Sequence, residues 1–245
     1  MDEKNKYTGM DILDLAQMAP ESVFDEARKI LETLVGYKEL RMMYACALKE
    51  VRTKFEVLDV EFNVRYSRNP INAIHTRLKS NQSILEKMQR RRIPFSLENL
   101  ESRIQDVAGV RVICSYVDDI YRLSEALLRQ DDVKLIAQKD YIQQPKPNGY
   151  RSLHIVVDVP VYLSQGKLFI PVEIQIRTVA MDFWATLEHG IRYKSSDEVP
   201  AFIVDELRNC ADVITRTDAK MQEIFKALQL LNDKEDDFHW RSSED

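Results

Sequence analysis

The segment Val172–Thr178, with the sequence VEIQIRT, alternates strictly between apolar and polar side chains. A period of two predicts a β-strand that buries one of its faces. The inward face would carry three aliphatic side chains and the outward face a carboxylate, an amide and a guanidinium: Val172, Ile174 and Ile176, and then Glu173, Gln175 and Arg177. Hydrogen-bonding groups placed in such a row are costly to leave without polar partners. The pattern therefore predicts a sheet with one apolar face and one ligand-binding face.

The remaining apolar periodicity predicts helices that flank this sheet. Helical spacing runs over 22–67, where we expect Gly36 to divide it into two helices, and again in a long stretch after Pro200. Between these stretches we expect short helices and about five strands, over 74–79, 107–115, 133–142, 152–159 and 167–177. The order predicts an α+β fold with a mixed five-stranded sheet, helices on its faces and long terminal helices. We expect a flexible N-terminus over 1–20, a single domain over 21–232 and a polar tail over 233–245.

Composition limits the classes of protein that the chain can belong to. No run of apolar residues is long enough to span a bilayer and no signal peptide is evident, so we expect a cytoplasmic protein with no membrane partner. The three cysteines lack metal-site or disulfide spacing. The net charge of −5 argues against a large non-specific nucleic-acid surface, so no obligatory nucleic acid is expected.

A basic cluster lies where one predicted strand leads into a helix. Arg77 and Lys79 share a strand face, Ser80 is a good N-cap, and the helix then presents one stripe of side chains: Ser83, Lys87 and Arg90 or Arg91. The free N–H groups of a helix start favour phosphate. A solvated basic face explains such a cluster equally well. Because no Walker A or G-x-G-x-x-G motif is present, side chains rather than a glycine loop would hold any nucleotide.

Two acidic residues suggest a metal site. Asp106 begins an apolar strand on which Gly109 permits close approach to the backbone and Arg111 stands among valines. If that strand neighbours the one that carries Glu173, the two carboxylates form a pair of the kind that Mg²⁺ takes from proteins when it carries a nucleotide. Read alone, Asp106 and Arg111 could equally be structural polar residues.

The loop 145–154, with the sequence PKPNGYRSLH, is rigid and rich in polar groups. Its Pro-Asn-Gly turn allows a positive φ at Gly149 and delivers Tyr150, with His154 further along the next strand. An aromatic ring beside Lys146 and Asn148 suits stacking on a base together with recognition of its edge. The alternative is a tight turn with a surface tyrosine.

These motifs together resemble one family. The blocks R-x-K-S-x-x-S-I-x-x-K, D-x-A-G-x-R, PKPNGYRSLH, EIQIRT and AMDFWAxLEH run in order from about residue 70 to 194 and resemble the RelA/SpoT-homologue synthetases. The length and the lack of a His-Asp dipeptide point to the single-domain small alarmone synthetases, without a hydrolase half. The resemblance implies a nucleotidyltransferase-type sheet and Mg²⁺-dependent transfer of the ATP β,γ-pyrophosphate to the 3′-hydroxyl of GDP or GTP, releasing AMP. It thereby implies a part in stringent-response signalling.

The resemblance also implies roles for individual residues. Asp106 and Glu173 would bind Mg²⁺, and Glu173 would act as the base that takes the hydroxyl proton. Two arginines would sandwich the adenine and a basic set would hold the ATP phosphates: Arg77 and Arg111, and then Lys79, Ser83, Lys87 and Arg90. The acceptor nucleotide would be stacked by Tyr150 and placed by a polar set: Lys146, Asn148, His154, Gln175 and Arg177.

The stretch before the R-x-K-S strand points to a branch of this family. Relatives that are activated by their product carry a Phe and a Gly there, whereas this chain has Ala73 and Thr76. It therefore resembles the RelP-type more than the RelQ-type synthetases. The family and the apolar faces of the terminal helices imply a homo-oligomer, expected to be a tetramer.

Two other functions compete with this one. A template-independent nucleotidyltransferase would show a Gly-Ser followed by paired Asp residues at a strand end, and this chain lacks both. A non-catalytic RNA-binding regulator could use the basic stretch 87–92 and Tyr150, although the acidic balance disfavours it.

Overall fold

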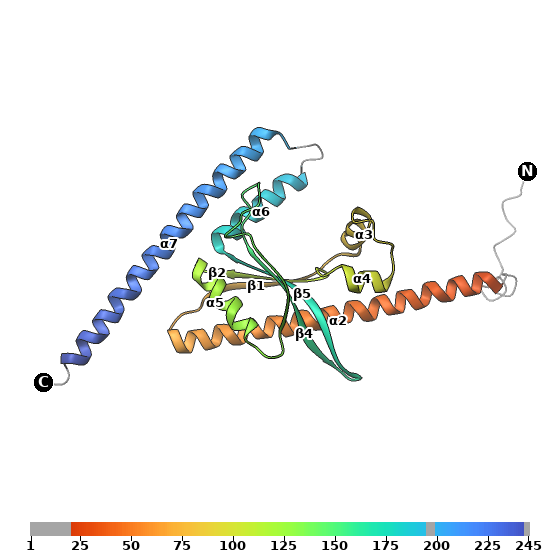
Figure 1. Ribbon diagram of the computed structural model, residues 1–245, viewed down its shortest axis with the longest axis horizontal. Coiled ribbons are helices and arrows are strands. Elements are labelled where there is room, and N and C mark those ends of the chain that lie inside the picture. Colours follow the sequence, from red (N-terminus) through yellow and green to blue (C-terminus); the bar gives the residue numbers. More distant parts are fainter. Residues whose placement is uncertain (1–20, 195–198, 243–245) are drawn as a thin grey trace, which may run out of the picture.

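The computed structural model describes residues 21–194 and 199–242, so the predicted flexible segment 1–20 lies outside the described residues. The elements, in chain order, are α2 (Glu21–Tyr66), β1 (Ile71–Leu78), α3 (Asn81–Arg90), α4 (Leu97–Arg103), β2 (Ala108–Cys114), α5 (Val117–Leu128), β3 (Lys134–Asp140), β4 (Leu153–Leu163), β5 (Gly166–Thr178), α6 (Val179–Lys194) and α7 (Ala201–Ser242). The predicted α+β fold with long terminal helices is confirmed (Figure 1). Helix α7 continues into the segment predicted as a polar tail, as far as Ser242.

The prediction that Gly36 divides the first helix is wrong, because α2 is one continuous helix of 46 residues. A Cβ at Gly36 would lie 2.7 Å from Cδ1 of Leu97, the first residue of α4. The missing side chain therefore lets α4 approach α2, and this contact explains a glycine inside a helix without a break.

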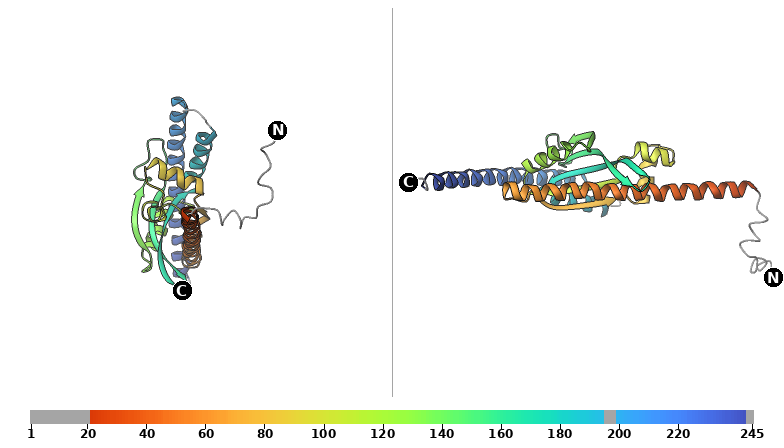
Figure 2. Two further views of the ribbon diagram at one scale, coloured as in Figure 1. Left: turned by 90° about the vertical axis from the view of Figure 1, so that its right-hand side faces the viewer. Right: turned by 90° about the horizontal axis from the view of Figure 1, so that it is seen from below.

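The five strands form one mixed sheet in the order β1-β2-β5-β4-β3. Only β2 and β5 pair in parallel, while the other three neighbouring pairs are antiparallel. Helices α2 and α7 extend past the sheet at opposite ends (Figures 1 and 2). This parallel pair brings the strand that follows Asp106 beside the strand that carries Glu173.

One face of the sheet forms the hydrophobic core. Val172, Ile174 and Ile176 are completely buried there, as their alternation predicted. The long helix α2 packs on the sheet, and α5 joins the same core through Ile120, Leu123 and Leu127 and other side chains. These residues hold the sheet rigid, so that the polar side chains on its opposite face are presented in fixed positions.

The opposite face carries polar side chains in rows across the strands. Residues paired by register point to the same side of a sheet. One row, from β1 to β3, contains His75, Arg111, Gln175, His154 and Lys139. The next row contains Arg77, Gly109, Glu173, Val156 and Ala137. Gly109 therefore leaves open space between a guanidinium and a carboxylate.

Candidate functional site

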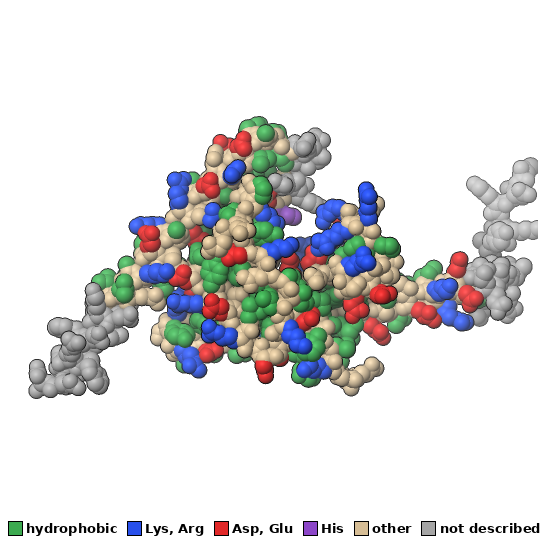
Figure 3. Space-filling model, in the orientation of Figure 1, with side chains coloured by type: hydrophobic (Ala, Val, Ile, Leu, Met, Phe, Trp, Pro, Cys, Tyr) green, Lys and Arg blue, Asp and Glu red, His purple; other side chains and the backbone are tan. Residues whose placement is uncertain are grey.

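Two cavities lie over this polar face. The first, called here the arginine cavity, has a volume of about 410 Å³ and is lined by nine residues of β1, β2, β5 and their ends: His75, Arg77, Lys79, Asp106, Gly109, Val110, Arg111, Glu173 and Gln175. The second, called here the lysine cavity, has a volume of about 240 Å³, and its charged and aromatic lining is Lys87, Arg91, Arg103, Asp106, Lys139, Tyr141, Lys146, His154 and Glu173. Lysine and arginine side chains gather over α3, at the rim of the gap between α3 and α6 (Figure 3). Both cavities therefore suit a ligand with several negative charges.

Asp106 lines both cavities and is paired with two lysines. Its Oδ2 lies 2.7 Å from Nζ of Lys79 and 2.6 Å from Nζ of Lys87. Burial alone would raise the pKa of Asp106, but the hydrogen bonds from the two lysines outweigh it and lower the pKa. The other oxygen, Oδ1, is buried and has no hydrogen-bond partner. An ionised carboxylate with one unsatisfied buried oxygen fits a site for a cation.

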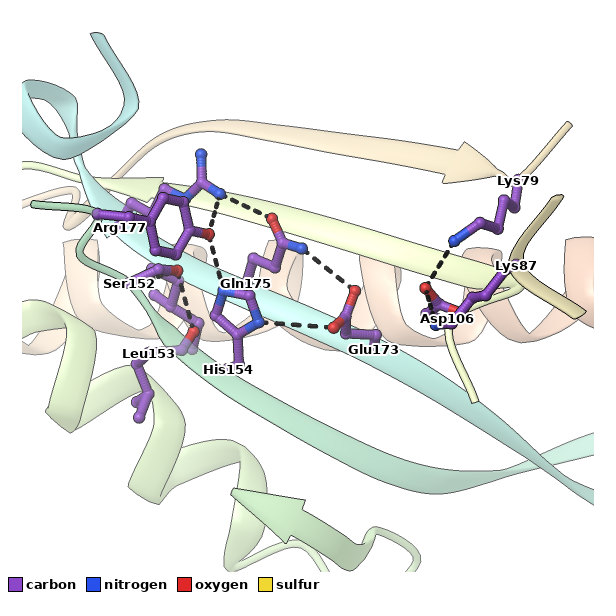
Figure 4. Close-up of polar contacts among 11 residues, drawn as sticks. Lys79, Lys87, Asp106, Ser152, Leu153, His154, Glu173, Gln175 and Arg177 are labelled. Carbon is purple, nitrogen blue, oxygen red and sulfur yellow. Dashed lines mark hydrogen bonds and ion pairs between the residues drawn. The ribbon is translucent and has the colours of Figure 1, made fainter. Parts of the chain in front are cut away.

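Glu173 also lines both cavities and belongs to a closed circuit of polar side chains (Figure 4). Its Oε1 lies 3.5 Å from Nδ1 of His154, and its Oε2 accepts a hydrogen bond of 3.2 Å from Nε2 of Gln175. The circuit closes through Arg177, which donates to Gln175 at 2.9 Å and to the hydroxyl of Tyr150, which in turn lies 2.8 Å from Nε2 of His154. Burial opposes ionisation of Glu173, yet the bonds from His154 and Gln175 leave its pKa lowered.

Local turn geometry sets the position of the Tyr150 ring. The N–H of Gly149 donates to the carbonyl of Lys146 at 2.8 Å, and Gly149 has a φ of +90°, which favours glycine. The Lys146 ammonium lies 4.7 Å from the Tyr150 ring centre and 4.6 Å from that of Tyr141. The Lys146 cation therefore lies against two aromatic rings, of which Tyr141 lines the lysine cavity and Tyr150 contacts His154 in its lining.

The structure brings most of the predicted site residues together. Arg77, Lys79, Asp106, Arg111, Glu173 and Gln175 line the arginine cavity, and Lys87, Lys146 and His154 line the lysine cavity. Tyr150 and Arg177 line neither cavity but contact residues that do. Tyr150 contacts His154 of the lysine cavity, and Arg177 donates to Gln175 of the arginine cavity. The guanidinium of Arg177 is buried, and its hydrogen bonds fix the positions of the Tyr150 and Gln175 side chains.

Three further predicted residues, Ser83, Asn148 and Arg90, neither line a cavity nor belong to the polar circuit. The hydroxyl of Ser83 accepts a hydrogen bond from Ser80, the N-cap of α3, at 2.9 Å. Asn148 donates to Glu188 of α6 at 3.0 Å and accepts from the N–H of Tyr150, so it stabilises the loop. Arg90 is exposed at the end of α3, and Arg91, the alternative at this position of the stripe, lines the lysine cavity instead.

Sequence reasoning missed several residues at the site. Tyr141 and Lys139 follow from the pairing of β3 with β4, and Arg103 comes from the end of α4. Asp182, in the first turn of α6, bonds Arg111 and Arg177. Its position in the AMDFWA block directly after β5 was a usable signal, because a helix that begins where a strand ends can reach back over the sheet.

Two ionised carboxylates between cationic cavities can hold a divalent cation and neutralise a chain of phosphates. In the described part of the chain no group of three or more His, Cys, Asp and Glu side chains could form a metal site. Mg²⁺, by contrast, is commonly bound by one or two carboxylates, with water and substrate phosphates completing its octahedron. A pair of carboxylates is a donor set that fits Mg²⁺ carried by a nucleotide.

Comparison with known proteins gives consistent matches. Residues 76–198 match the family model described as the region found in RelA/SpoT proteins. The chain is 41% identical over 204 residues to the GTP pyrophosphokinase YwaC of Bacillus subtilis, covering 83% of this chain and 96% of the relative. The fold is similar to the crystal structure of small alarmone synthetase 2 from Bacillus subtilis, with a TM-score of 0.72 and 42% identity over 78% of this chain and 98% of the other. Small alarmone synthetase 1 from the same organism, bound to its product pppGpp, gives a TM-score of 0.72 and 37% identity over 79% and 98%.

Proposed function

This chain belongs to the RelA/SpoT family and, within it, to the small alarmone synthetases, and we propose that this GTP pyrophosphokinase carries out its reaction where the arginine and lysine cavities meet. The reaction moves the β,γ-pyrophosphate of ATP to the 3′-hydroxyl of GTP or GDP and releases AMP. The higher identity to small alarmone synthetase 2 than to small alarmone synthetase 1 is the order expected for the RelP-type branch.

The observation that carries this proposal is the shared position of Asp106 and Glu173. Both carboxylates line both cavities, so a donor in one cavity and an acceptor in the other would meet beside them. Phosphoryl-type transfer depends mainly on positioning and on neutralising charge. In this arrangement the adenine would lie between Arg77 and Arg111, with Lys79 and Lys87 near the ATP phosphates.

The acceptor would occupy the lysine cavity. Tyr150 and Lys146 would contact the guanine. His154 and Gln175 hold Glu173, and His154 lines the cavity in which the acceptor ribose would lie. Glu173 would take the proton of the acceptor's 3′-hydroxyl while the 3′-oxygen forms a bond to the β-phosphorus of ATP. The bond from that phosphorus to the oxygen of AMP breaks in the same step. The lowered pKa keeps Glu173 ionised and able to accept this proton at neutral pH.

We propose that Mg²⁺ is held by Asp106 and Glu173. The unpartnered Oδ1 of Asp106 supports this assignment, since a bound cation would satisfy it. When bound with ATP, the ion would neutralise charge on the transferred pyrophosphate. The side chains of this chain then hold the phosphates, orient the acceptor and accept its proton.

The assembly and the compartment are also proposals. Exposed apolar side chains on the terminal helices, among them Leu34 and Val64 of α2 and Leu228 of α7, support a homo-oligomer, which we expect to be a tetramer. None of the described helices is both long and apolar enough to cross a bilayer. We propose the cytoplasm as its compartment, because ATP and GTP are available there, and 21–232 as a single catalytic domain.

The direct test is to incubate the purified protein with Mg²⁺, ATP labelled at the β-phosphate, and GDP or GTP, and to separate the products. We expect a guanosine nucleotide with two new phosphates and an equal amount of AMP, and no product once EDTA is added. Addition of nucleotides to an RNA end, with release of pyrophosphate, would instead indicate a template-independent nucleotidyltransferase. RNA binding without consumption of ATP would indicate the RNA-binding regulator.

Gly149→Ala is expected to raise the KM for the acceptor by about tenfold or more, because it shifts the Tyr150 loop. The new Cβ would lie 2.6 Å from Cβ of Ala211 on α7, and the φ of +90° strains any side chain. Adding Ala211→Gly removes the collision and should restore part of the affinity. Steady-state kinetics with each substrate varied in turn measures the effect.

Gly166→Ala is the matched control for this substitution. Gly166 also has a positive φ, of +140°, but a Cβ there would meet nothing within 4 Å. It should lower the melting temperature slightly and leave both KM values unchanged. An unchanged acceptor KM in Gly149→Ala would contradict the role given to the loop.

A further inference from the structure

Asp182 joins two arginines that come from different strands. Its Oδ1 lies 3.3 Å from Nη1 of Arg111 on β2 and 3.2 Å from Nη1 of Arg177 on β5. The first turn of α6 carries it directly after β5, and Thr178 fixes that turn by accepting the N–H of Met181 at 3.1 Å. One carboxylate oxygen is therefore held over the sheet between two guanidinium groups.

Each of these arginines serves a different substrate site. Arg111 lines the arginine cavity and is partly exposed to it. Arg177 is 4% exposed and donates to Oε1 of Gln175 and to the hydroxyl of Tyr150. Through Tyr150, which contacts His154 of the lysine cavity, it supports the acceptor side. In the part of the chain that the structure describes, Asp182 is bonded to both Arg111 and Arg177.

Both guanidinium groups are held in part by this carboxylate. Their Nε atoms are buried and have no hydrogen-bond partner. Burial and the nearby charge of Arg177 lower the pKa of Arg111, and Asp182 acts in the opposite direction. Without Asp182 the two cations would repel each other across the sheet, and each would have fewer bonds to fix its orientation.

We propose that Asp182 is a positioning residue that couples the donor and acceptor sites. A nucleotide that stacks on Arg111 would fix Asp182 and Arg177, and Arg177 would then hold Tyr150 and Gln175 ready for the acceptor. Each substrate should therefore bind more tightly when the other is present. This inference rests on the proposed function, because it takes the arginine cavity as the site of ATP and the lysine cavity as that of the acceptor.

The test measures this coupling by calorimetry. The Kd of a non-hydrolysable ATP analogue is determined with and without saturating GDP, in the parent protein and in Asp182→Asn and Asp182→Glu. We expect each nucleotide to tighten the other in the parent and the coupling factor to fall about fivefold or more in Asp182→Asn. Asp182→Glu, which keeps the charge, should recover part of it.

Asp118→Asn is the matched control. Asp118 is also an aspartate in the first turn of a helix, α5, and its carboxylate lies 2.7 Å from Lys226, away from both cavities. If Asp182 only stabilised the start of α6, the two Asn variants would lower the melting temperature alike and leave the coupling unchanged.

Each outcome is decisive. No coupling in the parent, unchanged coupling in Asp182→Asn, or a Glu variant no better than the Asn variant would overturn the role of Asp182. A parent protein that binds neither nucleotide and makes no guanosine product would instead overturn the proposed function. If Asp182→Asn folds poorly, the coupling factor of Asp182→Glu, compared with that of the parent, still tests the inference.

Discussion

Glu173→Gln is expected to fold like the parent protein and to lose alarmone synthesis by ~10²-fold or more. The amide has the shape of the carboxylate and can still accept one hydrogen bond from His154 or Gln175, so the fold should lose about 1 kcal/mol or less of stability. What the amide cannot do is accept the proton of the acceptor hydroxyl or contribute charge to a bound Mg²⁺. Initial rates of AMP release, with both nucleotides saturating, measure the loss.

Asp158→Asn is the control for this prediction. Asp158 is a carboxylate on β4, the strand that pairs with the β5 strand of Glu173. Burial raises the pKa of Asp158, but this residue lines neither cavity. Its substitution should leave synthesis within about twofold of the parent rate, as for most changes away from a site. Parent-like turnover by Glu173→Gln would refute the assignment of Glu173 as base and metal ligand.

Asp106→Asn should also reduce synthesis by about 10²-fold or more and shift the dependence on Mg²⁺ to higher concentrations. The amide removes one charge from the metal site and leaves the two ammonium groups of Lys79 and Lys87 without the anion that separates them. These lysines would then repel each other in the space meant for the ATP phosphates. Rates measured across a Mg²⁺ titration test the shift.

The matched control is Asp132→Asn, which removes a similar ion pair far from both cavities. Oδ2 of Asp132 lies 2.7 Å from Nζ of Lys54. Its loss should change the melting temperature slightly and leave the Mg²⁺ titration unchanged. An Asp106→Asn protein with the parent's Mg²⁺ dependence would contradict the proposed metal site.

The lowered pKa of Asp106 predicts that the stability of the fold depends on pH. Because the pKa of Asp106 is lowered in the folded protein, its ion pairs stabilise the fold above the ordinary aspartate pKa. That contribution disappears as the pH falls through the lowered pKa. The difference in melting temperature between the parent and Asp106→Asn should therefore shrink below pH ~4.

Local patterns predicted the elements of this fold well where apolar periodicity was clear. The alternation around Glu173 assigned both faces of β5, and Ser80 marked the start of α3. The break expected at Gly36 was wrong, because what decides that position is contact with Leu97 of a different helix. A glycine in a helix has the same local signal whether it ends the helix or admits a neighbour.

The same distinction explains what the sequence left open at the site. Asn148 was expected at the acceptor, yet it bonds Glu188, a residue of a helix whose place beside the loop no local pattern reveals. The spacing left Arg90 and Arg91 equally acceptable, and the position of α3 beside the sheet brings Arg91 to the cavity. Asp182 had no expected role, since its two partners come from strands β2 and β5.

By itself, the sequence determined which side chains point away from the core, because backbone alternation in a strand is a local property. It also contained the motifs that identify the family. The tertiary structure decided which of those side chains meet: strand order 1-2-5-4-3 places Gly109 beside Glu173 and brings Asp106 to the same cavities. Lateral neighbours in a sheet depend on hydrogen bonds between segments distant in the chain, and no local pattern specifies them.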